Sequence, residues 1–133
     1  MNIKRYVLAV IILFLFIYAY ESVVHGVLLM NIYNETPNLW RNYDEMMSYL
    51  PFHIVLMAIL AIWITFIFTQ FFKEGGVQNG FYFGLYLGIL AGLHAAGAYF
   101  YLPISASLAS IWFITYVIES TLGGMIIGLI YRR

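Results

Sequence analysis

Four long apolar segments dominate the chain, and short polar stretches separate them. A hydrocarbon core of about 30 Å is crossed by a helix of about 20 apolar residues. The segments that meet this length are residues 6–30, 50–72, 80–102 and 106–131. The pattern predicts an all-α protein in which residues 1–133 form a single integral-membrane bundle of four transmembrane helices.

The first apolar segment follows Lys4 and Arg5, as the core of a secretory signal peptide also follows basic residues. It is longer than the roughly 7–15 residues of such a core, and no small-x-small cleavage site closes it. We therefore expect residues 6–30 to be retained as the first transmembrane helix.

Two of the predicted connections are short and one is long. Residues 73–79 contain Lys-Glu-Gly-Gly, a polar turn, and residues 103–105 form a brief turn that begins with proline. The connection over residues 31–49 carries carboxylates and aromatic residues of the kind that gather at membrane interfaces. Within it, residues 42–47 are expected to form a short interfacial helix.

The basic residues predict the orientation of the bundle. If the four helices alternate in direction, a single basic residue, Arg41, lies on one side of the membrane. The opposite side carries Lys4, Arg5, Lys73, Arg132 and Arg133. Because cytoplasmic loops are enriched in lysine and arginine, we expect both termini in the cytoplasm. The predicted location is a bacterial-type inner (cytoplasmic) membrane, which the chain crosses several times.

Composition supports this class and excludes others. The chain is 64% hydrophobic and 9% charged, whereas soluble domains carry roughly 25% charged residues. Its formal net charge is zero, which leaves no broad basic surface for nucleic acid. It has no cysteine, which excludes disulfides, thiolate metal sites and a cysteine nucleophile.

Small residues recur at intervals of four in the last two predicted helices. Gly84, Gly88 and Gly92 follow one face of the third segment, and Gly124 and Gly128 follow one face of the fourth. Such glycine-zipper patterns let two helix backbones approach closely in lipid, where packing drives association. Two interpretations stay open: packing within the chain, or a seam for a second copy or another membrane protein.

Five ionisable residues fall inside the predicted spans. At a rise of 1.5 Å per residue, Glu21, His94 and Glu119 lie about 18–21 Å from the cytoplasmic edge, and His25 and His53 lie about 27 Å from it. Glu21 and His25 are four residues apart and share one helix face. Because an isolated charge at such depth costs several kcal/mol, we expect all five side chains to turn inward. They would form one polar cluster in the outer half of the bundle, with further hydrogen bonds from Tyr18, Ser22, Thr115, Tyr116 and Ser120.

This cluster has three interpretations. It is a set of interhelical hydrogen bonds that fixes helix packing. Alternatively, Glu21, His25, His53 and His94 bind a transition metal, or His25 and His53 serve as axial haem ligands. In the third interpretation the carboxylates and imidazoles relay protons or cations from mid-membrane to the outside. The cytoplasmic half of the bundle has no ionisable side chain to continue that path.

Two resemblances add to this reading. The words His25-Gly26-Val27-Leu28-Leu29 and Trp40-Arg41, together with Met46, Met47 and the glycine spacing, resemble small uncharacterised bacterial four-helix membrane proteins. That likeness implies the bundle and no activity. The layout of four helices with a glutamate in the first is similar to that of small multidrug resistance transporters. The sequence around Glu21 and the additional Glu119 depart from those transporters, so drug–proton antiport is an analogy of layout.

No motif of a soluble enzyme occurs in the chain, such as a nucleophile elbow, a phosphate loop or HExxH. We therefore expect a small non-catalytic membrane protein, either an accessory subunit of a larger membrane complex or a homo-oligomer. The expected partners are the lipid bilayer and a membrane protein or a second copy. The alternatives are a metal- or haem-binding protein and a small proton- or cation-coupled transporter.

Overall fold

The computed structural model describes residues 2–131, and helices form almost all of this part of the chain. Its four long helices are α1 (Ile3–Val23), α3 (Tyr43–Phe71), α4 (Val77–Ala96) and α5 (Ala106–Ile130). Shorter elements join them: η1 (Val24–Leu28, a π-helix), α2 (Met30–Tyr33), η2 (Pro37–Leu39) and η3 (Gly97–Phe100). Extended by η1 and η3, these four helices are long and apolar enough to cross a membrane.

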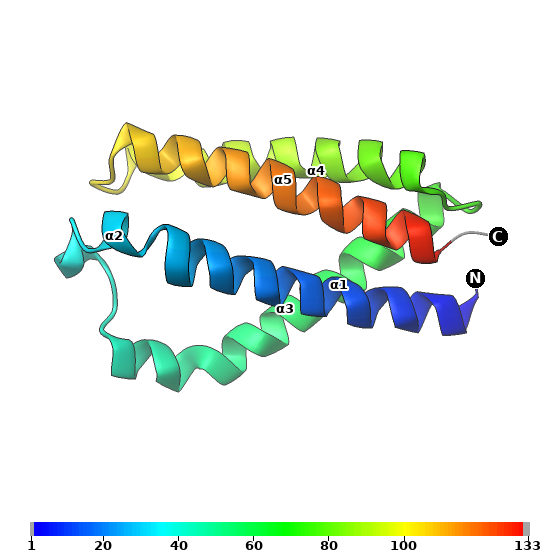
Figure 1. Cartoon of the computed structure of the whole chain (residues 1–133), viewed down its shortest axis with the longest axis horizontal. Helices are drawn as coiled ribbons and strands as arrows, with labels where there is room; N and C mark the ends of the chain where they lie inside the picture. The colour runs from blue at the N-terminus through cyan, green and yellow to red at the C-terminus, as the bar shows by residue number, and fades with distance from the viewer. Residues whose placement is uncertain (1, 132–133) are drawn as a thin grey trace.

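The two ends of the bundle differ in what they contain (Figure 1). Both chain termini lie at one end, here called the terminal end. The connections 29–42 and 97–105 lie at the other, here called the loop end. Arg132 and Arg133, which contribute to the predicted orientation, lie outside the described residues.

Side-chain caps explain where three of the long helices begin. Asn2, Asn42 and Ser105 each accept a hydrogen bond from the backbone N–H three residues later, at the starts of α1, α3 and α5. Such caps satisfy one of the N–H groups that a helix N-terminus leaves free. The Asn42 cap also explains a difference from the sequence prediction. Helix α3 begins at Tyr43 instead of Leu50 and absorbs the short interfacial helix expected at 42–47.

Helices α4 and α5 form a tight antiparallel pair in which glycines of each helix face the backbone of the other. Gly84, Gly88 and Gly92 are buried against α5, and Gly124 and Gly128 are buried against α4. A methyl group placed on Gly88 would lie 2.8 Å from the Cα atom of Val117, closer than atoms pack. The glycine stripes thus pack against each other within the chain, and they are not available as a seam for a partner.

A two-glycine turn closes the terminal end of this pair. Gly75 and Gly76 have φ angles of 67° and 101°, a backbone conformation that residues with a Cβ rarely adopt. The backbone N–H of Gly76 donates to the carbonyl oxygen of Gly128 at 2.9 Å. The turn therefore enters α4 already attached to the end of α5.

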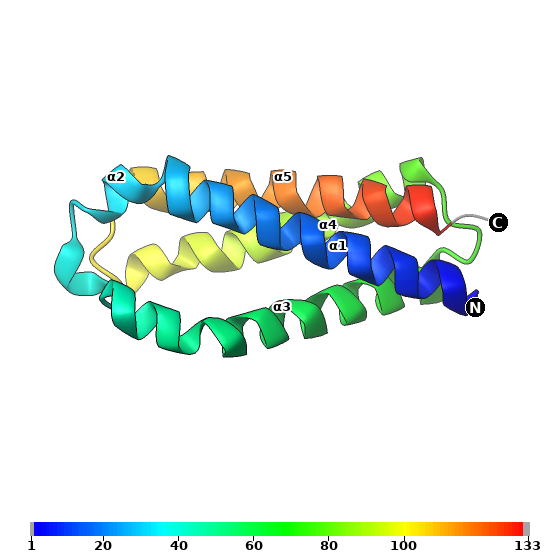
Figure 2. The same ribbon diagram turned by 60° about the horizontal axis from the view of Figure 1, so that its bottom comes forward.

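Helix α1 packs on α5, and α3 crosses α1 on its other side (Figure 2). The core at the terminal end combines residues of three helices, namely Ala9, Leu13, Ile17, Met57, Ala61, Phe68, Ile127 and Tyr131. The Tyr6 hydroxyl adds a hydrogen bond to the Ile62 carbonyl oxygen at 3.1 Å. Toward the loop end α3 diverges from the bundle, and none of its residues 43–56 is buried.

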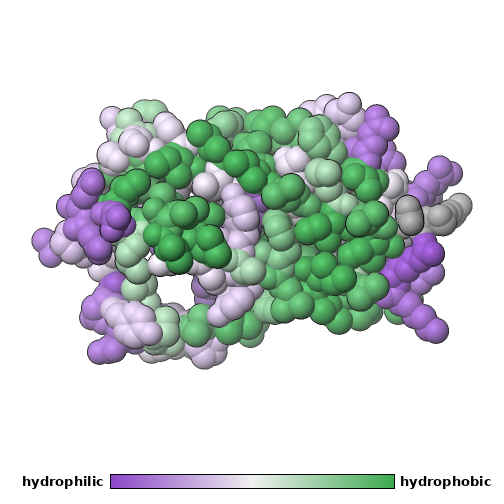
Figure 3. Space-filling model, in the orientation of Figure 1, coloured by the Kyte–Doolittle hydropathy of each residue, from purple (hydrophilic) through white to green (hydrophobic). Residues whose placement is uncertain are grey.

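The surface agrees with a membrane-spanning bundle. Figure 3 shows hydrophobic residues over the middle of this face and hydrophilic residues gathered at its two ends. A soluble protein rarely exposes so continuous an apolar surface. Many large apolar side chains are covered by no other helix, as expected of helices long and apolar enough to cross a membrane.

Candidate functional site

The side chains of Glu21 and His25 are in contact across the end of α1 and the start of η1. His25 Nε2 lies 3.2 Å from Glu21 Oε2, and the two residues are one helical turn apart. The His25 side chain is 31% exposed and the Glu21 side chain is 20% exposed, so both remain accessible from outside the core. The sequence prediction that these two residues share one helix face agrees with this contact.

The π-helical turn η1 brings a third residue, Tyr33, to the pair. The backbone N–H of Leu29 bonds to the Val24 carbonyl oxygen at 2.9 Å, five residues earlier instead of four. After this turn the chain bends, and the Tyr33 hydroxyl hydrogen-bonds His25 Nδ1. The two rings are stacked with centroids 5.9 Å apart, whereas residues eight apart in a straight α-helix are separated by about 12 Å. Single π-turns of this kind often occur at functional sites.

Two tryptophans fix Tyr33 from the other side. Trp112 of α5 donates its indole N–H to the Tyr33 hydroxyl oxygen at 3.0 Å. Trp40 donates to the Tyr33 carbonyl oxygen at 3.1 Å and stacks edge-on against the Tyr33 ring. Burial raises the pKa of the Tyr33 phenol above its ordinary value of 10.0, and the nearby Glu21 charge acts in the same direction. Tyr33 is thus held as a neutral hydroxyl between α1 and α5.

Glu119 of α5 completes the cluster at its most buried point. It is 7% exposed, and its carboxyl group lies near that of Glu21. Within residues 2–131 one of its oxygens, Oε1, has no hydrogen-bond partner. Two carboxylates side by side in an apolar setting repel each other, so the doubly charged state of the pair is disfavoured.

These contacts join into one path, which we call the polar chain: Glu119, Glu21, His25 and Tyr33. Glu119 lies near Glu21, Glu21 contacts His25 at 3.2 Å, and His25 hydrogen-bonds the Tyr33 hydroxyl. A further bond braces the path where α1 meets α5, from the Tyr20 hydroxyl to the Thr115 carbonyl oxygen at 2.9 Å. The chain runs from a buried carboxyl group in the middle of α5 to the loop end of the molecule.

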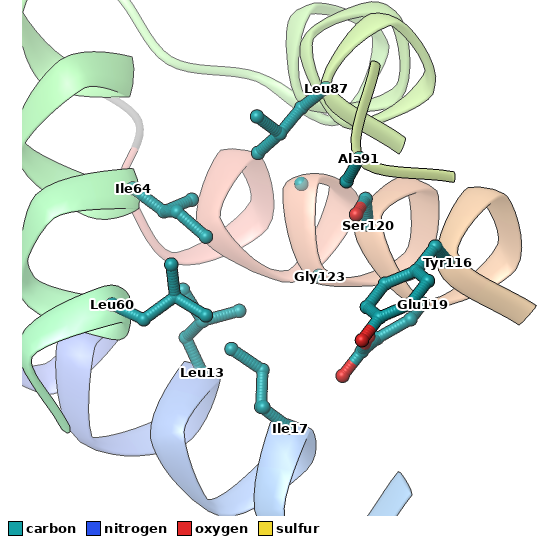
Figure 4. A pocket seen from close by; sticks show the side chains of 11 residues that line it. Leu13, Ile17, Leu60, Ile64, Leu87, Ala91, Tyr116, Glu119, Ser120 and Gly123 are labelled. Carbon is teal, nitrogen blue, oxygen red and sulfur yellow. The ribbon is translucent and has the colours of Figure 1, made fainter. Parts of the chain in front are cut away.

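A cavity of about 140 Å³ lies beside Glu119, on the side away from the loop end. Figure 4 shows side chains from four helices around it. Its apolar walls are Leu13, Ile17, Leu60, Ile64, Leu87 and Ala91, with Gly123 and Gly124 on the α5 side. Its polar groups, Tyr116, Glu119 and Ser120, all belong to α5. The cavity is therefore apolar with one polar side.

The structure places the other two predicted cluster residues apart from this site. His53 and His94 are exposed, and neither forms an ion pair or hydrogen bond with Glu21, His25 or Glu119. His94 follows Gly92 by two residues, about 200° around the helix, so it points away from the side that packs on α5. His53 lies in the part of α3 that diverges from the bundle.

The metal and haem hypothesis gains no support from this arrangement. In the described part of the chain, no three His, Asp or Glu side chains are grouped so that they could hold a metal ion. Two of the four proposed ligands, His53 and His94, are exposed and separate from Glu21 and His25. Residues 2–131 thus contain no grouped ligand set for a metal ion.

Sequence reasoning missed the aromatic half of the site. Tyr33, Trp40 and Trp112 resemble ordinary interfacial aromatics, and no spacing signals that η1 folds Tyr33 back onto His25. Two of the hydroxyl groups expected to complete the cluster instead bond within their own helices. Ser22 donates to the Tyr18 carbonyl oxygen, and Thr115 donates to that of Trp112.

The chain matches no protein-family model, no curated protein and no solved structure.

Proposed function

We propose that this protein exchanges protons between a buried carboxyl pair and one side of a bacterial-type cytoplasmic membrane. In this proposal both termini lie in the cytoplasm and the loop end faces outward. The observation that supports it is the polar chain from Glu119 through Glu21 and His25 to Tyr33. Chains of carboxylates and histidines inside a membrane typify proton pathways.

Each member of the chain has chemistry suited to this role. The Glu21–Glu119 pair holds a proton in an apolar setting, where the doubly charged state is strongly disfavoured. His25 lies 3.2 Å from Glu21, and an imidazole ring can both accept and donate a proton. The Tyr33 hydroxyl both donates and accepts, and it carries the path to the loop end.

The path leads to one side only. From Glu119 toward the terminal end, the facing residues of α1 and α5 are apolar and include Leu13 and Ile127. A proton therefore enters and leaves through the loop end. The step involves no covalent bond beyond O–H and N–H, so we propose a proton-exchanging protein and not an enzyme.

Infrared spectroscopy of the protein in lipid nanodiscs tests this proposal. A protonated buried carboxyl group gives a C=O band that shifts in D₂O and disappears as the group ionises. We expect such a band to titrate with pH, to be lost in Glu119→Gln and to shift in Glu21→Gln, where the buried carboxyl group loses its neighbour. Glu35→Gln, which changes an exposed loop carboxylate, is the matched control. A band that both site variants leave unchanged would contradict the proposal.

The bare half of α3 favours a second candidate, an accessory subunit or a homo-oligomer. Residues 43–56 contain no buried residue, and Phe52 and Leu56 are among its large exposed side chains. Because the chain has no cysteine, single cysteines report contacts cleanly. Phe52→Cys should cross-link to a partner or second copy in native membranes, whereas Leu129→Cys on α5 should not. Equal cross-linking at both positions would contradict a specific interface on α3.

A further inference from the structure

We propose that the chain binds one phospholipid with an amine in its head group, phosphatidylethanolamine, in an opening between α1 and the loop-end half of α3. The opening itself and one row of side chains on α3 carry this proposal. None of these side chains belongs to the polar chain, so the lipid site and the proposed proton exchange stand or fall separately.

The bundle has an opening at the loop end. Figure 3 shows it passing through the molecule, and Figures 1 and 2 place it between α1 and the half of α3 that diverges. The space-filling view is open there, so no side chain spans the gap. An empty space in hydrocarbon would deprive its walls of packing contacts. In a bilayer we therefore expect a lipid or another protein segment to fill it.

One row of side chains leads along α3 into this opening. Arg41, Glu45, Tyr49, His53 and Met57 are spaced by four, so each lies beside the next along one side of the helix. We call them the α3 row. Met57 is buried in the core at the terminal end, where α1 and α3 still touch. The earlier members therefore extend from this contact toward the surface, along the place where the two helices separate.

The chemistry of the α3 row changes with depth in the order of the parts of a phospholipid. The apolar run of this helix is predicted to begin at residue 50. At 1.5 Å per residue, Glu45 lies about 7 Å outside that level and His53 lies about 5 Å inside it. The head-group layer is about 5–8 Å thick on each side of the hydrocarbon. Glu45 is thus level with the head groups, His53 with the ester groups, and Met57 with the acyl chains.

The head-group end of the row carries one charge of each sign. Arg41 and Glu45 form an ion pair; the Arg41 side chain is 59% exposed and the Glu45 side chain is 40% exposed, so both keep free hydrogen-bonding positions. The Arg41 guanidinium lies 4.8 Å from the centre of the Tyr49 ring, which holds it beside α3. A guanidinium binds phosphate through paired N–H groups, and a carboxylate accepts from an ammonium group. One phosphate and one ammonium in the same head group match this pair.

His53 supplies the contact below the head group. Within residues 2–131 it has no hydrogen-bond or ion-pair partner, although it lies inside an expected span. A polar side chain left unsatisfied in hydrocarbon is costly. A phospholipid has ester carbonyl oxygens at this depth, and they accept the proton that an imidazole N–H donates. The lipid thus gives a partner to a histidine that the proposed function does not use.

Another side of α3 stays free for a protein partner. Phe52 and Leu56 each lie one position before a member of the α3 row, about 100° around the helix. The lipid covers the side of the helix that faces the opening. The interface of an accessory subunit or second copy uses the side with Phe52 and Leu56.

Native mass spectrometry of the full chain in detergent, with added lipid, tests this proposal. The probes are phosphatidylethanolamine, phosphatidylcholine and phosphatidylglycerol with identical acyl chains. We expect one phosphatidylethanolamine to be retained per chain, with roughly tenfold higher affinity than either of the others. Phosphatidylcholine has no N–H group to donate to Glu45, and phosphatidylglycerol brings a net negative charge toward that carboxylate.

Two matched pairs of variants assign the contacts. Glu45→Gln should remove the preference for phosphatidylethanolamine over phosphatidylcholine, whereas Glu35→Gln, in the same connection, should keep it. His53→Phe should weaken retention of all three lipids by roughly fivefold, since it removes one hydrogen bond. His94→Phe, at the other exposed histidine of the spans, should not. Circular dichroism checks that each variant keeps its helices.

A variant that fills the opening locates the lipid. Ile54, next to His53 on α3, is half-buried, and Ile54→Trp should abolish retention of the lipid. Equal retention of the three lipids, an unchanged affinity in Ile54→Trp, or equal losses in His53→Phe and His94→Phe would overturn the proposal. Disulfide cross-linking between two Ile54→Cys chains in native membranes would show that a second copy fills the opening, and would overturn it as well.

Discussion

Helix α5 has two contact faces that are built by opposite means. Toward α4 the contact consists of backbone against backbone, made possible by glycines such as Gly84 and Gly124. Toward α1 and α2 it consists of polar side-chain contacts, from the Trp112–Tyr33 hydrogen bond at the loop end to the neighbouring carboxyl groups of Glu119 and Glu21 deeper in the bundle. The cavity lies beside the second face.

The difference separates the stable part of the molecule from the part that responds to its surroundings. Glycine packing depends on shape and carries no titratable group, so protonation does not alter it. The α1 contact contains two carboxyl groups, an imidazole and a phenol, so its strength depends on protonation. The α4–α5 pair is thus the platform on which the polar chain is held.

The largest expected effect comes from breaking the glycine contact. In Gly124→Leu the new side chain meets the Gly84 backbone, whose Cα and N atoms lie 2.9 Å from an added Cβ alone. We expect a loss of about 3 kcal/mol or more, at the upper end of the range for overpacked cores. Thermal unfolding in detergent, followed by circular dichroism, measures it. Gly97→Ala is the control, since nothing lies within 4 Å of its added Cβ.

A smaller effect is expected at the aromatic centre of the polar contact. Tyr33→Phe removes the hydroxyl group that accepts from Trp112 and bonds His25. Leaving such partly buried partners unsatisfied costs about 1–3 kcal/mol. Thermal unfolding should show this loss, and Trp fluorescence should shift. Tyr86→Phe, at an exposed tyrosine of α4, should change neither; an equal loss there would contradict the assigned role of Tyr33.

Tyr20→Phe probes the same contact more mildly. It removes one donor to the Thr115 carbonyl oxygen, and a single hydrogen bond of this kind contributes about 1 kcal/mol. A double variant with Tyr33→Phe tests whether the two bonds act together. If α1 docks on α5 as a unit, the two losses should not add. Full additivity would indicate independent contacts.

The smallest effect is a pH dependence. Because the pKa of Tyr33 is raised in the folded state, the folded chain keeps the phenol proton longer than the unfolded chain does. This contribution to stability is complete below pH about 10 and is lost as pH rises through the folded-state pKa. Unfolding experiments at increasing alkaline pH should show a steeper fall for the unchanged chain than for Tyr33→Phe.

Much of the fold follows from segment length and hydrophobicity. Four apolar runs predict four long helices, and glycines spaced by four predict close packing. The helix boundaries differ from the ends of the apolar runs where a side chain caps the helix. Asn42, for example, starts α3 well before the apolar run begins. No feature of the α3 sequence indicates that the helix diverges from the bundle, because an apolar helix face can be covered by lipid as well as by another helix.

The depth of the site residues along their helices was predictable from the sequence, but the side of the helix on which each side chain lies was only partly predictable. Glu21 and Glu119, whose expected depths match, lie near each other, and His25 contacts Glu21 from one helical turn away. His94 has a similar expected depth to Glu119 but is exposed. Its exposure could have been inferred from the sequence, because it lies about 200° around the helix from Gly92, which belongs to the packing face. The position of Tyr33 depends on a change of hydrogen-bond register that residue types do not reveal.

The altered hydrogen-bond register of η1 determines how a one-residue deletion in this segment would affect the site. The π-turn η1 accommodates one residue more per hydrogen-bonded loop than an α-turn does. Deleting the exposed Val27 would let the segment close as an ordinary α-helix. The shortened helix would still cross a bilayer, yet every later residue would rotate by about 100° and Tyr33 would lose its place on His25. A single-residue deletion would then disconnect the buried acid pair from the membrane surface without unfolding the bundle.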